Sequence, residues 1–118
     1  MENLCKVRDI QHAISTFENQ FEKKYEVTLN EGMALCSLYE VSNPLMSGEI
    51  GKLLGLSYPN TSKVIVSLEK KGFVERVVGA KDKRQMYFSL TGEGKKIIPK
   101  LQGNDTKILR LLKEIIEK

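Results

Sequence analysis

The hydrophobic positions change their spacing along the chain and so divide it into helical and extended segments. Residues 4–24 carry large apolar side chains at steps of three and four, with no Pro or Gly, which predicts a helix. A second helix is predicted over residues 29–40, with Thr28 and Glu31 as a capping box at its start. Residues 42–44 (Ser-Asn-Pro) break this helix and predict a linker.

The next segment, residues 47–72, predicts two short helices separated by a turn. The first covers roughly Gly48–Leu54, with apolar Ile50, Leu53 and Leu54 on one side. Gly55 readily adopts the left-handed backbone conformation that ends many helices, so we expect the first helix to stop there.

The second helix of this segment has an apolar face and a polar face. Ser57 is placed to cap it, and Pro59 is tolerated in its first turn. The buried stripe is expected to comprise Thr61, Val64, Ile65 and Leu68. The opposite face carries polar side chains: Asn60, Lys63, Ser67 and Lys70. This pattern predicts a helix-turn-helix whose second helix enters the major groove of DNA.

After Gly72 the period changes to that of strands. Residues 73–78 and 85–90 predict two short strands, and the loop at 79–84 contains three cations: Lys81, Lys83 and Arg84. A hairpin with a basic tip directly after a helix-turn-helix is typical of the wing of a winged helix. An ordinary charged turn is the alternative interpretation.

The C-terminal segment is again helical. Thr91 is placed to cap a helix that begins at Gly92, and Pro99 lies within it, so one bent helix and two helices both remain open. From residue 105 onward the helix has a wide apolar face formed by Ile108, Leu109, Leu111, Leu112, Ile115 and Ile116. This surface exceeds what one small domain can hide, which predicts a homodimer that pairs both chain ends with those of a second copy.

The expected fold class is mainly α (α+β): a winged helix-turn-helix with N- and C-terminal dimerisation helices. The 118 residues are enough for a single domain. We expect residues 1–27 and 92–118 to be the dimerisation helices. Residues 28–91 would form the DNA-binding core, with the wing at 73–90.

Composition and charge narrow the functional class. No apolar run has the length of a membrane span or a signal peptide, which predicts a cytoplasmic protein with no membrane partner. Cys5 and Cys36 are then expected to be thiols. The net charge is +4, and residues 1–45 hold four basic and seven acidic side chains, whereas residues 46–90 hold eight basic and four acidic ones. A basic segment that begins at the helix-turn-helix favours a phosphate-binding face, with a solvated surface as the alternative.

The sequence does not favour an enzyme. It has no nucleophile-elbow or phosphate-loop motif, and its single histidine and two distant cysteines do not form a metal-ligand pattern. We therefore expect no cofactor and no metal.

Three blocks resemble the MarR family of bacterial winged-helix transcription regulators. They lie at residues 54–57 (Leu-Gly-Leu-Ser) with 68–76, at 82–84 (Asp-Lys-Arg), and at 90–94 (Leu-Thr-Gly-Glu-Gly). Their order and spacing fit over about residues 25–98, and the short chain is similar to the SarA-like branch. The resemblance implies a homodimer that binds double-stranded DNA at a palindromic operator.

The resemblance also implies site residues. Arg84 would be the wing arginine in the minor groove, with Asp82 as the carboxylate that orients it. Asn60 and Lys63 match positions that contact base edges, and Lys81 and Lys83 would contact phosphates. The full set of expected DNA-binding residues is Ser57, Tyr58, Asn60, Ser62, Lys63, Ser67, Lys81, Asp82, Lys83 and Arg84.

Three departures from the family pattern affect these expectations. Thr61 stands where an aliphatic residue is usual, and the C-terminal region is short. Gly32 replaces a larger residue that borders the effector pocket in many relatives, so the usual small-molecule effector site is not expected in its ordinary form.

Some relatives sense oxidants through a cysteine in the first helix, and Cys5 matches loosely. A cysteine-based redox-sensing regulator and a winged-helix protein-interaction module, to which Tyr58 and Val66 point, are the alternative functions.

Overall fold

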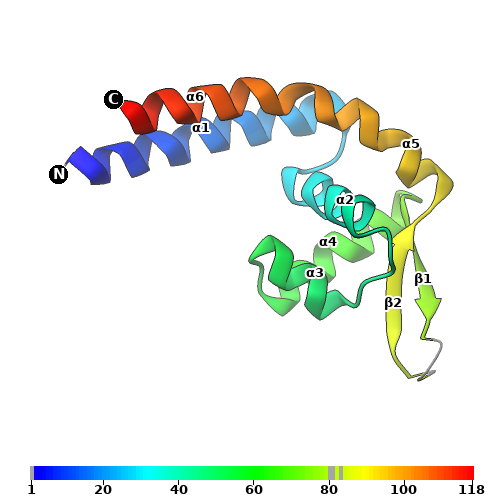
Figure 1. The fold of residues 1–118 in the computed structure, drawn as a ribbon. Helices are drawn as coiled ribbons and strands as arrows, with labels where there is room; N and C mark the ends of the chain where they lie inside the picture. The colour runs from blue at the N-terminus through cyan, green and yellow to red at the C-terminus, as the bar shows by residue number, and fades with distance from the viewer. Residues whose placement is uncertain (1, 80–81, 83) are drawn as a thin grey trace. The chain divides into compact units, whose positions relative to one another are not determined.

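The computed structural model describes residues 2–79, 82 and 84–118, and these form helices and one small sheet (Figure 1). In chain order the elements are α1 (Glu2–Tyr25), α2 (Leu29–Val41), α3 (Ser47–Leu54), α4 (Tyr58–Lys70), β1 (Val74–Val78), β2 (Met86–Leu90), α5 (Gly92–Leu101), the 3-10 turn η1 (Gln102–Asn104) and α6 (Asp105–Glu117). The predicted mainly α fold class with a small two-stranded sheet is confirmed, and dimerisation through the terminal helices stays a prediction. The chain divides into two compact units, one formed by residues 1–29 with 101–118 and the other by residues 30–100.

The first unit is a pair of long helices, α1 and α6, that lie side by side (Figure 1). The Nζ of Lys6 donates a hydrogen bond to the carbonyl oxygen of Ile116 at 3.2 Å, so the start of α1 lies beside the end of α6. The rings of Phe17, Phe21 and Tyr25 are in contact along α1, with centroid distances of 5.8 Å and 5.0 Å for successive pairs. The contact between Lys6 and Ile116 shows that the two helices are antiparallel, while the ring contacts order one face of α1.

The second unit holds the helix-turn-helix and the hairpin around a shared apolar core. The buried side chains come from each of its elements: Leu35 and Leu38 of α2, Ile50 of α3, Ile65 and Leu68 of α4, Val74 of β1, Phe88 of β2 and Ile98 of α5. Burial of this apolar area is the main source of stability for a unit of this size.

The sheet of this unit is an antiparallel hairpin in which Val74 pairs with Leu90 and Val78 pairs with Met86. Leu45, in the linker between α2 and α3, adds a bridge to Phe88 through two backbone hydrogen bonds of 2.8 and 3.0 Å. The linker is thus fixed to β2 just before α3 begins.

One expectation for α3 is wrong. Leu53 was expected on the apolar side of this helix, but it is 58% exposed, whereas Ile50 and Gly51 are buried. Successive residues of a helix are about 100° apart, so Leu53 lies nearly opposite Gly51. Because α3 approaches its neighbour through Gly51, the buried face turns away from Leu53.

The C-terminal segment consists of two helices, α5 and α6, joined by η1, and Pro99 lies within α5. In the part of the chain that the structure describes, no helix is both long enough and apolar enough to cross a membrane.

Candidate nucleic-acid interface

The turn between α3 and α4 is built from local backbone preferences. Gly55 adopts the left-handed conformation, with φ 69° and ψ 30°, and ends α3 as predicted. The Oγ of Ser57 accepts a hydrogen bond from the backbone N–H of Asn60 at 3.4 Å and so caps α4. Pro59 lies in the first turn of α4. The sequence therefore fixes where α4 starts.

The two faces of α4 separate as the sequence predicted. The four residues of the expected stripe are buried: Thr61, Val64, Ile65 and Leu68. On the other side Tyr58, Asn60 and Lys63 are exposed and Ser62 is half-buried. A shallow hollow of about 380 Å³ on this outer face is lined by Ser62, Lys63, Val66, Ser67 and Lys70. The helix thus offers a polar, cationic surface to a partner.

The cations near α4 fall into two groups. Arg76 of β1 forms a two-pronged ion pair with Glu69, with Nε–Oε2 2.8 Å and Nη2–Oε1 3.2 Å, and its guanidinium lies 5.8 Å from the Phe88 ring. The hydrogen bond and charge of Glu69 raise the pKa of Arg76. Lys71 donates to Glu31 at 2.9 Å. Lys63 and Lys70, in contrast, have no ion-pair partner among the described residues. Their charge is therefore available to an anionic partner.

The tip of the hairpin holds an Asp-Arg contact. Asp82 Oδ1 accepts from the backbone N–H of Arg84 at 2.9 Å and from its Nε at 3.2 Å, and Oδ2 accepts from Nη2 at 3.4 Å. Hydrogen bonds from Arg84 lower the pKa of Asp82. The larger effect comes from the backbone N–H and the smaller one from the side chain. The Arg84 side chain is 92% exposed. The orienting contact expected of these two residues is present, while Lys81 and Lys83 lie outside the described residues.

Two contacts of this unit were not found from the sequence. Ser67, expected at phosphates, donates its hydroxyl hydrogen to Oε2 of Glu31 at 2.8 Å. Glu31, expected in a capping box, is 2% exposed and lies between Ser67 and Lys71. The signal that could have revealed Glu31 is its place four residues before Leu35, on the buried stripe of α2. A carboxylate at such a position requires a partner in the interior.

Among the described residues, neither cysteine belongs to a cluster of metal-ligating side chains. Cys5 is exposed in α1 and Cys36 is half-buried in α2. Within residues 2–79, 82 and 84–118, no cluster of three or more His, Cys, Asp or Glu side chains could hold a metal ion. The redox role of Cys5 stays a prediction.

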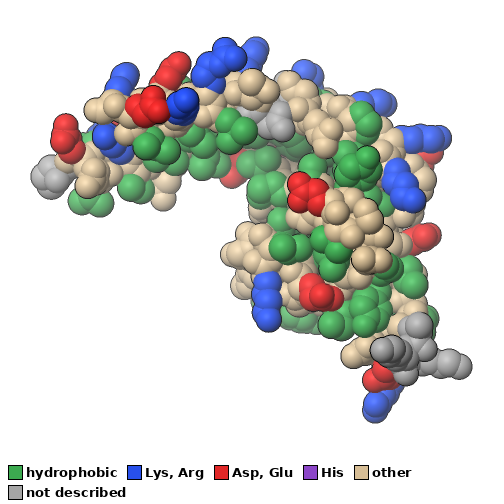
Figure 2. Space-filling view, viewed as in Figure 1, with side chains coloured by type: hydrophobic (Ala, Val, Ile, Leu, Met, Phe, Trp, Pro, Cys, Tyr) green, Lys and Arg blue, Asp and Glu red, His purple; other side chains and the backbone are tan. Residues whose placement is uncertain are grey.

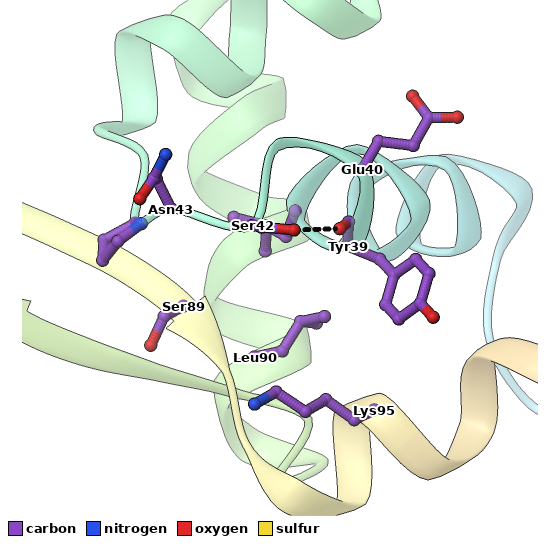
Figure 3. Close-up of a pocket in the computed structure, with 9 residues that line it drawn as sticks. Tyr39, Glu40, Ser42, Asn43, Ser89, Leu90 and Lys95 are labelled. Atoms are coloured by element: carbon purple, nitrogen blue, oxygen red, sulfur yellow. Dashed lines mark hydrogen bonds between the residues drawn. The ribbon is translucent and has the colours of Figure 1, made fainter.

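A larger cavity lies within the second unit, where α2, the linker, β2 and α5 meet. It has a volume of about 650 Å³ and is lined by Leu38, Tyr39, Glu40, Ser42, Asn43, Pro44, Ser89, Leu90 and Lys95. Tyr39, Leu90 and Lys95 approach the opening from three elements, while Glu40 points away from them (Figure 3). The hydroxyl of Ser42 donates to the carbonyl oxygen of Tyr39 at 3.2 Å.

Comparison with curated proteins gives a relative with the same kind of DNA-binding motif. The chain is 30% identical over 94 residues to YwaE of Bacillus subtilis, an uncharacterized HTH-type transcriptional regulator. The match covers 80% of this chain and 54% of that protein, so the chain spans about half the length of the curated relative it matches.

Among solved structures, the chain is similar to MepR of S. aureus. A mutant of MepR is 25% identical with a TM-score of 0.75, covering 92% of this chain and 80% of MepR. A MepR–DNA complex is 26% identical with a TM-score of 0.64 and covers 94% and 87%. MepR bound to ethidium bromide is 26% identical with a TM-score of 0.62 and covers 93% and 76%.

The sequence model of the MarR family matches residues 27–86, which is more than half of the chain and includes α2, α3, α4 and β1. Regulators of this family are DNA-binding transcription factors and not enzymes, in agreement with the expectation from the sequence. The chain belongs to the MarR family.

Proposed function

We propose that the chain is a sequence-specific DNA-binding transcription regulator that acts as a homodimer on a palindromic operator. The observation that carries this proposal is the division of cations around α4. Arg76 and Lys71 are held by carboxylates, whereas Lys63 and Lys70 lie on the outer face and have no ion-pair partner in the described part of the chain. Phosphate neutralisation by such side chains supplies much of the affinity for DNA. The similarity to MepR, which has been solved with DNA, supports the proposal.

In this proposal α4 lies in the major groove. Lys63 and Asn60, both exposed, contact base edges, as Lys to guanine and Asn to adenine. Ser57 and Ser62, near the start of α4, bond phosphates and set the register of the helix on the duplex. Tyr58 is 72% exposed beside them and completes the contact surface.

The hairpin acts as the wing. Arg84 enters the minor groove, where the negative potential favours a guanidinium. Asp82 orients this guanidinium through hydrogen bonds before DNA is bound. Lys81 and Lys83 contribute phosphate contacts, as the sequence predicts. Part of the affinity therefore lies outside α4.

The homodimer is supported by the apolar surface of the first unit. Large apolar side chains are exposed on both helices, with exposed fractions of 69% for Leu4, 63% for Leu109 and 58% for Ile116. Figure 2 shows hydrophobic side chains on the surface of this helix pair. A groove of about 530 Å³ runs between α1 and α6 past Ala13, Phe17 and Leu111. A second copy would cover these side chains and place two recognition helices about 34 Å apart.

The cavity beside Tyr39 and Lys95 is the candidate place for a small-molecule effector. It combines an apolar wall with an ammonium group and several hydroxyl groups, a mixture that suits small organic ligands. MepR has been solved with ethidium bound, which supports a ligand-responsive regulator.

Selection from a library of random double-stranded DNA tests the function. We expect an enriched palindromic sequence that binds more tightly than a scrambled duplex at every salt concentration. Arg84→Ala should weaken binding of the enriched sequence by roughly 1–3 kcal/mol without loss of the fold. The absence of any enriched sequence would contradict the proposal.

Two alternatives have their own discriminating results. The exposed apolar side chains Tyr58 (72%) and Val66 (41%) favour a protein-interaction module, which would retain a protein partner but select no DNA. A redox-sensing regulator requires that peroxide weakens DNA binding through Cys5. If binding by Cys5→Ser were as sensitive to peroxide as that of the wild type, the redox role would be discarded.

A further inference from the structure

A buried carboxylate connects α2 to the proposed recognition helix. Glu31 lies in the first turn of α2, and its side chain is 3% exposed. Its Oε2 accepts from Ser67 Oγ at 2.8 Å, and its Oε1 accepts from Lys71 Nζ at 2.9 Å. A carboxylate removed from water is tolerated only with such partners. The hydrogen bonds of Glu31 therefore restrict how α4 can be oriented.

The spacing of the two hydrogen-bond partners of Glu31 determines how they hold α4. Ser67 lies in the last turn of α4 and Lys71 is the C-cap residue one helical turn later, so both side chains reach Glu31 of α2 from the same side. The apolar contacts of Ile65 and Leu68 hold α4 against the core, but such contacts are non-directional. Hydrogen bonds depend on angle as well as distance, so the bonds to Glu31 restrict rotation of α4 about its axis.

Ser67 also lines the hollow on the outer face of α4, next to Lys63 and Lys70. Glu31 is therefore hydrogen-bonded to α4 at the edge of the face that is proposed to contact DNA bases. A small rotation of the helix would move every outer side chain relative to the base edges, where productive hydrogen bonds need accurate placement.

We propose that Glu31 is a positioning residue for DNA recognition: through Ser67 and Lys71 it sets the rotation of α4 and hence the side chains that α4 presents to the bases. It does not touch DNA itself. The inference rests on the proposed DNA-binding function and adds a specificity-determining residue to it. Ser67 belongs to this attachment, and its hydroxyl hydrogen is committed to Glu31 and not to a phosphate.

The test compares Glu31→Gln with Glu75→Gln, which removes the same charge from an exposed carboxylate on β1 of the same unit. Affinities for the enriched operator and for a scrambled duplex are measured at one salt concentration, below the unfolding temperature of every variant. We expect Glu31→Gln to lower the ratio of the two affinities by about tenfold or more, because base contacts are lost while phosphate contacts remain. Glu75→Gln should leave the ratio within about twofold of the wild type.

Ser67→Ala provides a second, milder variant if Glu31→Gln does not fold, because Glu31 then retains its ion pair with Lys71. It should lower the ratio in the same direction, and the double variant Glu31→Gln with Ser67→Ala should lose little more than Glu31→Gln alone. A lower unfolding temperature with an unchanged affinity ratio would mean that Glu31 serves stability only, and would overturn the proposal.

A readout without DNA separates this inference from the proposed function. Backbone amide NMR shifts of Lys63, Val66 and Lys70 should change in Glu31→Gln and not in Glu75→Gln, because α4 changes its rotation. If the wild type selects no DNA sequence, the proposed function fails, and these shifts still decide whether Glu31 positions α4. Unchanged shifts would refute the positioning role.

Discussion

Gly51 of α3 and Thr61 of α4 are in contact at a distance that leaves no room for a side chain at position 51. A β-carbon built on Gly51 would lie 2.8 Å from Thr61 Oγ1 and 3.4 Å from the carbonyl oxygen of Leu56. The Thr61 hydroxyl is itself fixed, since it donates to the carbonyl oxygen of Ser57 at 2.8 Å. The close approach of α3 and α4 therefore depends on the missing side chain of Gly51.

Replacement of Gly51 by Ala should destabilise the protein by about 1–3 kcal/mol, because the added methyl group overpacks the contact with Thr61. Gly48→Ala is the matched control: it lies in the same helix, and its β-carbon would meet nothing within 4 Å. That change should be neutral or stabilising by up to about 1 kcal/mol. Urea unfolding of both variants measures the difference, and equal stabilities would contradict the packing argument.

The Gly51–Thr61 contact also explains a feature that the sequence left unresolved. Thr61 departs from the family pattern of aliphatic residues at this position, and its burial with a hydroxyl group could not be explained without its neighbour. The structure supplies two reasons: the Oγ1 bond to Ser57, four residues earlier, and the space left by Gly51. The first is local and could be inferred from the sequence, but the second depends on how two helices pack.

Other features of the molecule likewise depend either on local sequence, which can be predicted, or on contacts between distant residues, which cannot. The start of α4 and its N-cap were predicted because Gly55, Ser57 and Pro59 act on their own backbone. The bond between Glu31 and Lys71 joins residues 40 positions apart, so no local pattern reveals it. Arg76 is one of the eight basic side chains counted in residues 46–90, and only the structure shows that Glu69 holds it.

Asp82 should titrate at a lower pH than an ordinary aspartate, and Arg84→Ala should raise its pKa. The backbone N–H of residue 84 remains in that variant, so the pKa should not return fully to its usual value. The bonds to Arg84 are present above the ordinary pKa of 3.8 and are lost as the pH falls through the lowered pKa of the folded protein. Titration of the Asp82 carboxyl carbon by NMR measures this.

The control for this titration is Arg8→Ala, which removes a guanidinium that pairs with Asp9 on α1. It should leave the pKa of Asp82 unchanged. The same sign argument predicts that the Asp82–Arg84 contact contributes no change in DNA affinity between about pH 5 and 8, because Asp82 stays ionised there. An Asp82 pKa that is the same with and without the Arg84 side chain would show that the side-chain bonds do not persist in solution.

Lys63→Ala and Arg76→Ala remove the same charge but should affect the salt dependence of DNA binding differently. Lys63 has no ion-pair partner among the described residues, and a cation that contacts base edges also displaces counterions from the duplex, so its loss should reduce the slope of log affinity against log salt by about 1. Arg76 is already neutralised by Glu69, so Arg76→Ala should leave the slope nearly unchanged. Binding measured from low to physiological salt gives both slopes, and a similar reduction in both variants would remove the distinction between paired and unpaired cations.

The exposed apolar face of α6 should hold two copies of the chain together in solution. Ile116 is 58% exposed, and Ile116→Glu would place a charge among side chains that a partner covers, so this variant should sediment as a monomer. Glu114→Lys, two residues earlier and about 160° around the helix from Ile116, changes an exposed charge on the far side of α6 and should remain a dimer. The monomer should also lose most of its operator affinity, because its single recognition helix reads only one half-site. Sedimentation velocity at micromolar concentration decides the assembly, and a monomeric wild type would rule out the dimer.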